Sequence, residues 1–149
     1  MDDMIKQAKQ KALSLLNYMD RTESQLRQKL KEKSFDERAI DEAVEYVKSF
    51  GYVNDVSYAE RYILNKQNSK SKREIYASLS QKGISRDYIE AAMENCYDAE
   101  DELAAIHYLC EKKHFVTEKA TDIEKKKMYN YLLRKGFRGD NVCKVLNVR

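Results

Sequence analysis

The amino-acid sequence predicts an all-α protein, built as an elongated array of three tandem three-helix repeats with no β-sheet. One pattern occurs three times, as Leu26-x-x-x-Leu30-x-x-Lys33-Ser34-Phe35, Ile75-x-x-x-Leu79-x-x-Lys82-Gly83-Ile84 and Met128-x-x-x-Leu132-x-x-Lys135-Gly136-Phe137. The copies are 49 and 53 residues apart, a period typical of repeat arrays. The chain has no proline and four glycines, so helix breakers are few, and no segment shows the period-two alternation of a strand.

The second helix of each copy is delimited by its caps. Thr22-x-x-Gln25 and Ser71-x-x-Glu74 are capping boxes at the same place in the repeat, and Thr121-x-x-Glu124 comes slightly earlier in the third copy. These helices should end before Gly83 and Gly136, because glycine adopts the left-handed conformation of a helix C-terminus without steric cost. Ser34 occupies that position in the first copy.

The other helices follow from polar residues placed before apolar ones. Asp36 and Ser85 can cap the third helices, Asn54 or Asp55 the first helix of copy two, and Asp98 that of copy three. The inward positions of the third helices are Ile40, Ala43, Val44 and Val47 in copy one and Ile89, Ala92 and Met93 in copy two. We therefore expect repeats at 1–53 (with an N-terminal extension), 54–97 and 98–149.

Composition favours a folded cytoplasmic protein. The chain is 42% hydrophobic and 36% charged, as expected of amphipathic helices. The three cysteines form no CxxC pair, which indicates a reducing compartment. The amino end lacks the apolar region of a signal peptide, and no apolar run approaches the ~20 residues needed to span a bilayer. We therefore expect neither export nor membrane insertion.

Basic residues are distributed unevenly, although the net charge is only +3. The segment 125–139 holds six cations and no acid, and 66–86 holds six cations and one acid. Arg27 and Lys31 lie one helical turn apart, and Lys127, Tyr131 and Arg134 share a helix face, as at a phosphate or nucleic-acid surface. Lys72 and Arg73 begin a helix, where the dipole disfavours cations. This indicates either a further role for these cations or compensation by the neighbouring Glu74. The alternative for each cation is an ordinary solvated helix face.

Metal binding and catalysis find little support. His107, Cys110 and His114 share a helix face, but structural zinc needs a fourth ligand, so Cys110 is better explained as a core residue. The sequence contains no phosphate loop, GxSxG or HExxH motif. We therefore expect no metal, no cofactor and no enzymatic activity.

The ordered motifs resemble the RecX family of bacterial recombination regulators. The resemblance rests on Arg21-Thr22-Glu23-x-Gln25-Leu26-x-x-x-Leu30, on the Lys82-Gly83-Ile84 turn and on Gly51-Tyr52-Val53-Asn54-Asp55-x-x-Tyr58-Ala59. It covers roughly Ala12 to Leu146. It implies a curved, elongated helical array that acts in the bacterial cytoplasm, in homologous recombination, DNA repair and the SOS response. It further implies a negative regulator that binds the groove of the RecA filament on single-stranded DNA and inhibits its recombinase, ATPase and co-protease activities.

Our hypothesis is therefore a monomeric RecA regulator whose basic side chains bind the filament, with weak direct contacts to DNA. Similar surfaces presented at regular intervals would add avidity on a periodic partner. The predicted contact residues are Arg21, Arg27, Lys31, Lys72, Arg73, Lys82, Arg86, Lys127, Arg134 and Arg138. The alternatives are a stand-alone DNA-binding helical array, whose affinity for naked DNA would fall steeply with salt, and a helical adaptor for another protein.

Overall fold

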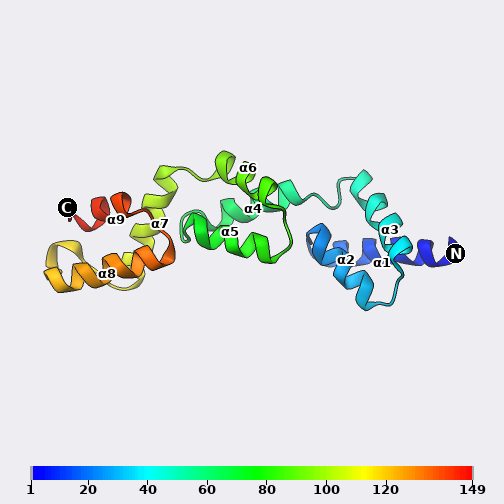
Figure 1. Ribbon diagram of the computed structural model, residues 1–149, viewed down its shortest axis with the longest axis horizontal. Helices are drawn as coiled ribbons and strands as arrows, with labels where there is room; N and C mark the ends of the chain where they lie inside the picture. The colour runs from blue at the N-terminus through cyan, green and yellow to red at the C-terminus, as the bar shows by residue number, and fades with distance from the viewer. Residues whose placement is uncertain (1, 149) are drawn as a thin grey trace. The chain divides into compact units, whose positions relative to one another are not determined.

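The computed structural model describes residues 2–148, and within this range the chain contains nine α-helices, one short 3-10 helix and no strand (Figure 1). The α-helices are α1 (Asp2–Tyr18), α2 (Glu23–Glu32), α3 (Glu37–Ser49), α4 (Asp55–Lys66), α5 (Lys72–Gln81), α6 (Arg86–Cys96), α7 (Ala99–Lys112), α8 (Asp122–Lys135) and α9 (Gly139–Leu146). The 3-10 helix is η1 (Thr117–Lys119). The all-α fold predicted from the sequence is confirmed. No helix in this range is long and apolar enough to cross a bilayer.

The chain forms two compact units whose boundary does not follow the repeats. Unit 1 comprises the residues up to 59 together with 79–89, and unit 2 comprises 60–78 and the residues from 90 onward. The boundary passes through α4, α5 and α6. The middle repeat therefore contributes residues to both units.

The core of unit 1 lies among α1, α2 and α3, which pack against one another (Figure 1). Ala8 and Ala12 of α1 are completely buried, and such small side chains let α3 approach closely. Leu26 and Leu30, the apolar positions of the repeated pattern, are also fully buried. Each contributes about 1.5–3 kcal/mol through removal from water. The predicted inward face of α3 is confirmed, since all four of its residues are buried.

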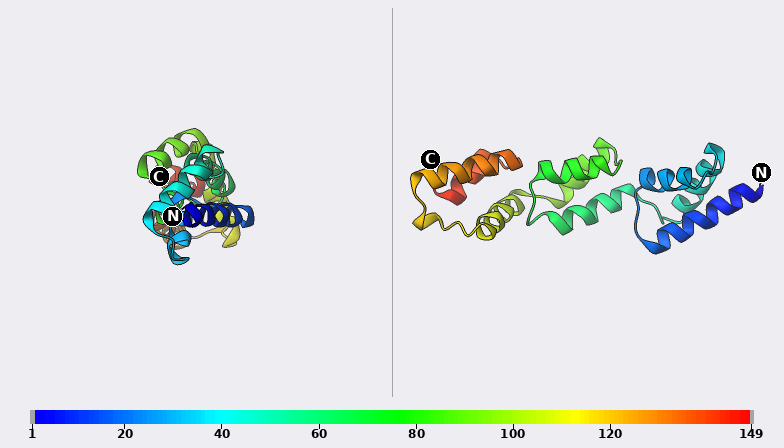
Figure 2. Two further views of the ribbon diagram at one scale, coloured as in Figure 1. Left: turned by 90° about the vertical axis from the view of Figure 1, so that its right-hand side faces the viewer. Right: turned by 90° about the horizontal axis from the view of Figure 1, so that it is seen from below.

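The core of unit 2 includes α7, α8 and α9, and α9 lies beside the other two helices (Figures 1 and 2). Ile106, Leu132 and Leu146, one from each helix, are fully buried. Cys110 is buried in the same cluster, as predicted. The Asn141 side chain donates a hydrogen bond to the buried carboxylate of Glu102, which ties α9 to α7.

The predicted caps are present. The Thr22 hydroxyl accepts from the Gln25 N–H at 3.1 Å while the Gln25 side chain accepts from the Thr22 N–H at 3.0 Å. Thr121 and Glu124 form the same reciprocal pair at the start of α8. Ser71 and Glu74 do so at the start of α5, with both distances 3.1 Å. Capping residues of this kind contribute about 1 kcal/mol each.

Two of these capping hydroxyls also make a second hydrogen bond to the following repeat. In unit 1, the Thr22 hydroxyl donates to the carbonyl of Lys82 at 2.7 Å. In unit 2, the Ser71 hydroxyl donates to the carbonyl of Lys135 at 2.6 Å. Both hydroxyl residues are completely buried, and both carbonyls lie at helix C-termini that lack an intrahelical partner. We call each such contact a joint.

Each joint also requires a glycine. A Cβ atom at Gly83 would overlap the side chain of Ser24, and one at Gly136 would lie 2.7 Å from the Cβ of Arg73. Ser24 and Arg73 stand at the same position, two residues after the capping hydroxyl. Both glycines also have positive φ, +87° and +104°. Ser34, with φ +70°, is exposed and belongs to neither joint.

Candidate partner-binding interface

The ten cations predicted to bind a partner divide equally between the units, and most of them are exposed. Unit 1 holds Arg21, Arg27, Lys31, Lys82 and Arg86; unit 2 holds Lys72, Arg73, Lys127, Arg134 and Arg138. Arg21, Arg27 and Lys82 are half-buried, and the other seven are exposed. Several already contact other parts of the chain, which separates structural cations from available ones.

Arg27 belongs to an ion-pair network in unit 1. Its guanidinium lies 3.0 Å from Glu23 and 2.7 Å from Asp41, which joins α2 to α3. Glu23 also pairs with Lys48 at 3.0 Å. Burial alone would raise the pKa of Glu23, but its hydrogen bonds with Lys48 and Arg27 lower it overall. Arg27 therefore stabilises unit 1, and its charge is largely neutralised.

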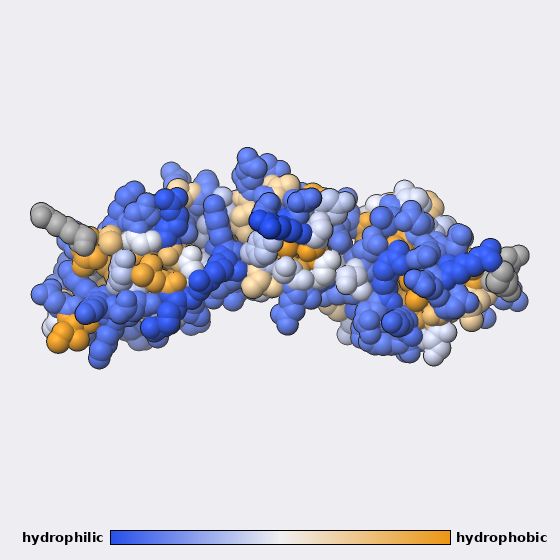
Figure 3. Space-filling view, in the orientation of Figure 1, coloured by the Kyte–Doolittle hydropathy of each residue, from blue (hydrophilic) through white to orange (hydrophobic). Residues whose placement is uncertain are grey.

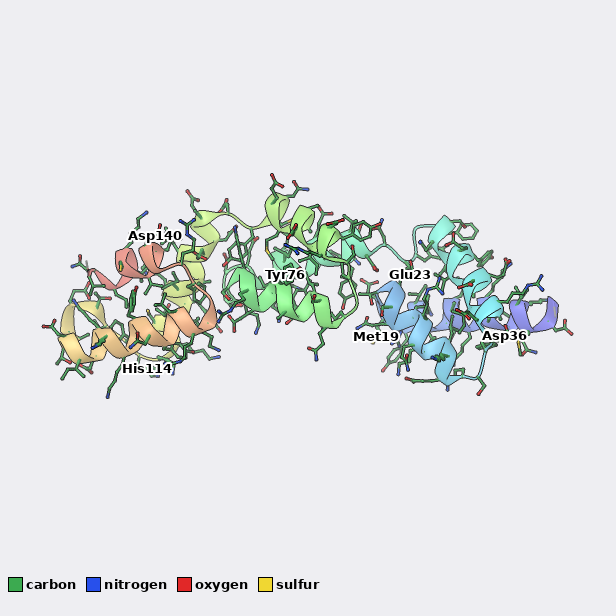
Figure 4. All side chains as sticks on the ribbon, viewed as in Figure 1. Met19, Glu23, Asp36, Tyr76, His114 and Asp140 are labelled. Atoms are coloured by element: carbon green, nitrogen blue, oxygen red, sulfur yellow. The ribbon has the colours of Figure 1, made fainter. Side chains whose placement is uncertain are left out.

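Asp55 completes the polar surroundings of Glu23. Glu23 lies at the start of α2, beside the segment that leads into α4 (Figure 4), and its backbone N–H donates to the Asp55 carboxylate at 2.9 Å. Burial raises the pKa of Asp55, and the nearby Glu23 charge raises it further, against the lowering effect of that hydrogen bond. Arg21 makes a contact of its own outside this ion-pair network: its Nε donates a hydrogen bond to the Leu15 carbonyl at 3.4 Å.

Arg73 has a structural role that the sequence did not predict. Its guanidinium donates to the backbone carbonyl of Arg134, at the C-terminal end of α8. A cation at a helix C-terminus is favoured by the dipole, so the interaction with α8 offsets the unfavourable position of Arg73 at the start of α5. Lys72 lies 5.6 Å from the centroid of the Tyr97 ring. The cations at the start of α5 are therefore explained by contacts within unit 2.

A groove in unit 1, which we call the α2 groove, brings together Arg27 and Lys31. It has a volume of about 610 Å³, and Phe35, Ile40 and Tyr88 supply apolar lining. Three acids, Glu23, Glu37 and Asp55, also line it. The α2 groove is thus mixed in charge.

A groove in unit 2, which we call the α8 groove, contains Lys127 and Arg134. Its volume is about 580 Å³, and its other charged lining residues are Lys113, Lys119 and Glu124, with His114 beside them. Glu124 caps α8, and hydrogen bonds from Thr121 lower the pKa of this carboxyl group. His114, on the turn after α7, is labelled in Figure 4. The predicted sharing of one face by Lys127, Tyr131 and Arg134 is confirmed, because all three line this groove.

A second cavity in unit 2, which we call the lysine pocket, shares Lys113 and Tyr131 with the α8 groove. Its volume is about 490 Å³, and five lysines line it with a single acid, Glu74. These lysines are Lys66, Lys70, Lys112, Lys113 and Lys135. None of them was among the predicted contact residues. The basic segment 66–86 indicated part of this pocket, because Lys66 and Lys70 belong to it. The sequence did not show that folding brings these two lysines beside the ends of α7 and α8.

Positive charge is therefore concentrated in unit 2. The α8 groove and the lysine pocket together contain eight lysine or arginine residues and two acids. This local excess of six charges exceeds the net charge of the whole chain, +3, so the rest of the molecule is net negative. Among residues 2–148, the ion pairs of this group are confined to Lys135 with Glu74, at 3.5 Å. Hydrophilic side chains cover most of the face shown in Figure 3.

The two histidines do not form a metal site with Cys110. No group of three or more His, Cys, Asp or Glu side chains is placed to hold a metal ion anywhere in residues 2–148. Burial raises the pKa of the Cys110 thiol, which disfavours the thiolate that binds metals. All three cysteines are free thiols.

Comparison with known proteins identifies the family. Models of the first, second and third three-helix domains of RecX match residues 8–46, 54–93 and 100–146. A relative from Caldanaerobacter subterraneus, named regulatory protein RecX, is 40% identical over 96% of this chain and 71% of its own length. The chain belongs to the RecX family. The resemblance predicted from the motifs is confirmed.

Other RecX relatives agree in sequence and structure. A regulatory protein RecX from Clostridium perfringens is 36% identical over 93% of this chain, which spans 66% of that relative. The crystal structure of RecX from Lactobacillus salivarius matches with a TM-score of 0.82 at 26% identity, covering 99% of this chain and 97% of that one. A second crystal structure, of a regulatory protein RecX, gives a TM-score of 0.83 at 25% identity, covering 98% of this chain and 74% of that one. The three-helix repeat fold of RecX proteins is thus the fold of this chain.

Proposed function

We propose that this RecX-family chain is a non-enzymatic negative regulator of RecA that binds the RecA filament on single-stranded DNA. In this proposal it occupies the filament groove and lowers recombinase, ATPase and co-protease activity. Family membership supports a regulatory role, since the relatives are named regulatory proteins. The observation that carries the assignment of a binding surface is the concentration of positive charge in the α8 groove and the lysine pocket.

The structure orders the predicted contact residues by availability. Lys127 and Arg134 line the strongly basic α8 groove, and Lys31 lines the α2 groove without a carboxylate partner among residues 2–148. We assign them direct contact with the partner. Arg27 and Arg73 hold helices together through Asp41 and the Arg134 carbonyl, so we assign them an indirect role. Arg138 pairs with Asp140 at 3.3 Å on an exposed surface, where such pairs are worth little and yield readily to a partner.

The test is DNA-dependent ATP hydrolysis by RecA from the same bacterium, with this protein titrated below stoichiometry. Lys127→Glu combined with Arg134→Glu should raise the concentration for half-inhibition at least tenfold, because two reversals on one basic surface each weaken binding. Lys144→Glu on α9, an exposed lysine outside both basic cavities, is the matched control and should inhibit normally. Circular dichroism should show equal helicity in all three proteins. Unchanged inhibition by the double variant would remove the α8 groove from the interface.

The concentration of lysines also favours one alternative, a stand-alone DNA-binding protein. Under that alternative, affinity for naked DNA accounts for all inhibition and falls steeply with salt. Naked-DNA affinity measured in the ATPase buffer separates the two functions. Inhibition at concentrations where naked DNA stays unbound supports filament regulation. Inhibition that appears only as DNA becomes saturated supports the alternative.

A further inference from the structure

The lysine pocket combines more positive charge with less acid than the α2 groove. Its five lysines come from three separate parts of the chain. Lys66 and Lys70 come from the end of α4 and the turn that follows, Lys112 and Lys113 from the end of α7, and Lys135 from the end of α8. A solvated helix face would place its lysines on one helix. Convergence from three elements requires a different explanation, because bringing like charges together costs free energy.

The backbone that carries these lysines is held in place. The Tyr97 hydroxyl donates to the Lys70 carbonyl at 2.9 Å, and the Ser71 hydroxyl donates to the Lys135 carbonyl at 2.6 Å. The turn after α4 is closed by the N–H groups of Ser69 and Lys70, which both donate to the Lys66 carbonyl at 3.0 Å. Three of the five lysines are only half-exposed. The backbone positions from which Lys66, Lys70 and Lys135 extend are therefore set before any ligand arrives.

Tyr131 further organises the pocket. The ammonium group of Lys113 lies 4.2 Å from the centroid of its ring, and that of Lys135 lies 5.6 Å away. Such cation–π contacts favour one orientation of a flexible lysine, so less side-chain entropy is lost when a ligand binds. Glu74 pairs with Lys135 and leaves the other four lysines without a carboxylate partner within residues 2–148.

We propose that the lysine pocket binds a compact run of linked phosphates, such as the phosphate chain of a nucleoside polyphosphate. The charge balance favours this ligand over a nucleic-acid backbone. The pocket volume of 490 Å³ corresponds to a cube with an edge of about 8 Å, which spans about two phosphates at the ~3.4 Å rise of a DNA strand. A triphosphate brings about four negative charges into the same space, because its terminal group ionises a second time near pH 6. Five lysines and one glutamate give the pocket a formal charge that matches the triphosphate.

The lining also suits a nucleotide more than a bare inorganic anion. Tyr108 and Leu109 line the same pocket, and Tyr108 is 44% exposed. An exposed tyrosine ring beside a phosphate site offers a surface for a base or sugar. The volume lies within the range of about 300–1,000 Å³ that small-molecule sites occupy. This inference does not depend on the proposed action on RecA.

The first experiment is calorimetric titration of the full chain with inorganic tripolyphosphate in phosphate-free buffer at constant ionic strength. We expect saturable binding of one ligand per chain, at least tenfold tighter than orthophosphate or sulfate. The double variant Lys70→Gln with Lys113→Gln should weaken binding at least tenfold. Lys144→Gln, which removes one exposed charge from α9 in the same unit, is the matched control and should bind normally.

Two further measurements locate the binding site and identify the kind of phosphate ligand. Mass-spectrometric mapping of lysine acylation should show protection of Lys70 and Lys113 by tripolyphosphate, with Lys144 unprotected. A titration with oligothymidylate distinguishes the source of the phosphates. Tight oligothymidylate binding without tripolyphosphate binding would overturn the proposal in favour of a nucleic-acid backbone. Equal loss of binding in the Lys144→Gln control, or no saturable binding, would overturn it as well. All these readouts are made without RecA, so failure of the proposed function leaves them unchanged.

Discussion

Alanine at Gly83 should destabilise the chain far more than alanine at Gly51, although both glycines have similar left-handed conformations. Their φ angles are +87° and +75°, and both belong to unit 1. A Cβ atom at Gly51 would meet nothing within 4 Å, whereas one at Gly83 would overlap the side chain of Ser24 in the first joint. Comparing the two substitutions separates the free-energy cost of placing alanine in a left-handed conformation from the cost of disturbing the joint.

The expected loss of folding free energy differs between the two substitutions. Alanine in the left-handed region costs about 1–2 kcal/mol, of which the reduced freedom of the unfolded chain offsets about 0.4–1 kcal/mol. Gly51→Ala should therefore cost about 1 kcal/mol. At Gly83 the added methyl must also push Ser24 away, which weakens the buried hydrogen bond from Thr22 to the Lys82 carbonyl. Leaving a buried polar group unpaired costs about 1–3 kcal/mol more. We expect Gly83→Ala to cost about 2–4 kcal/mol.

The assay is urea unfolding followed by circular dichroism at 222 nm, with free energies compared at equal denaturant slopes. A double variant provides the control. Ser24→Gly removes the side chain that the new Cβ would meet, so combining it with Gly83→Ala should recover most of the additional loss. If Gly83→Ala costs no more than Gly51→Ala, the overlap with Ser24 has no energetic consequence and the first joint does not require a glycine.

Three further predictions concern unit 1 and the second joint. Ser34→Gly should stabilise the chain by about 1 kcal/mol in urea unfolding, because Ser34 is exposed with φ +70°. Destabilisation would contradict this. Thr22→Val and Ser71→Ala should each cost about 1–3 kcal/mol, because each removes a hydroxyl that both caps its helix and donates across the joint. Thr22→Ser and Ser71→Thr keep the hydroxyl and should stay near wild type. Equal losses in both kinds of variant would show that the hydroxyl is not what matters. Glu23→Gln and Asp55→Asn should have opposite effects. The lowered pKa of Glu23 gives stability that is present above its ordinary value and lost as pH falls through the folded value, so Glu23→Gln should destabilise at pH 7 and cease to matter in acid. The raised pKa of Asp55 means that folding disfavours its charge, so Asp55→Asn should stabilise at pH 7, with the gain absent below the ordinary value of 3.8. Urea unfolding at several pH values checks both signs.

The sequence predicted the repeated framework because its determinants are local. A capping box needs residues three apart, and an inward helix face needs apolar residues at helical spacing, so both can be identified within one short segment. Thr22, Ser71 and Thr121 cap helices as predicted, and Leu26 and Leu30 are buried. The sequence did not show that two of these caps also hold the next repeat. That second hydrogen bond joins residues about sixty positions apart, as in Thr22 with Lys82.

The basic surface was predicted only in part, because a cation's role depends on what folding brings beside it. Lys127 and Arg134 share a groove, as their spacing on one helix indicated. Arg27 looks equally available in the sequence, but Asp41, fourteen residues away, neutralises it. Lys135 lies in the basic segment 125–139 and Lys113 outside it, yet both converge on Tyr131 from different helices. Spacing along one helix is therefore informative, whereas pairing and convergence between helices require the structure.

The chemistry of the joints repeats, whereas the α2 groove and the lysine pocket differ in charge. The joint chemistry recurs at equivalent positions, with a buried hydroxyl, a helix-terminal carbonyl and a glycine. The α2 groove contains two cations and three acids, whereas the lysine pocket contains five cations and one acid. The lysine pocket is therefore not a second copy of the α2 groove, and avidity from similar surfaces along a periodic partner stays a prediction. Repetition supplies a framework for the helices, and affinity for an anionic partner should reside mainly in unit 2. Charge reversals in unit 2 should consequently weaken binding more than the same number of reversals in the α2 groove.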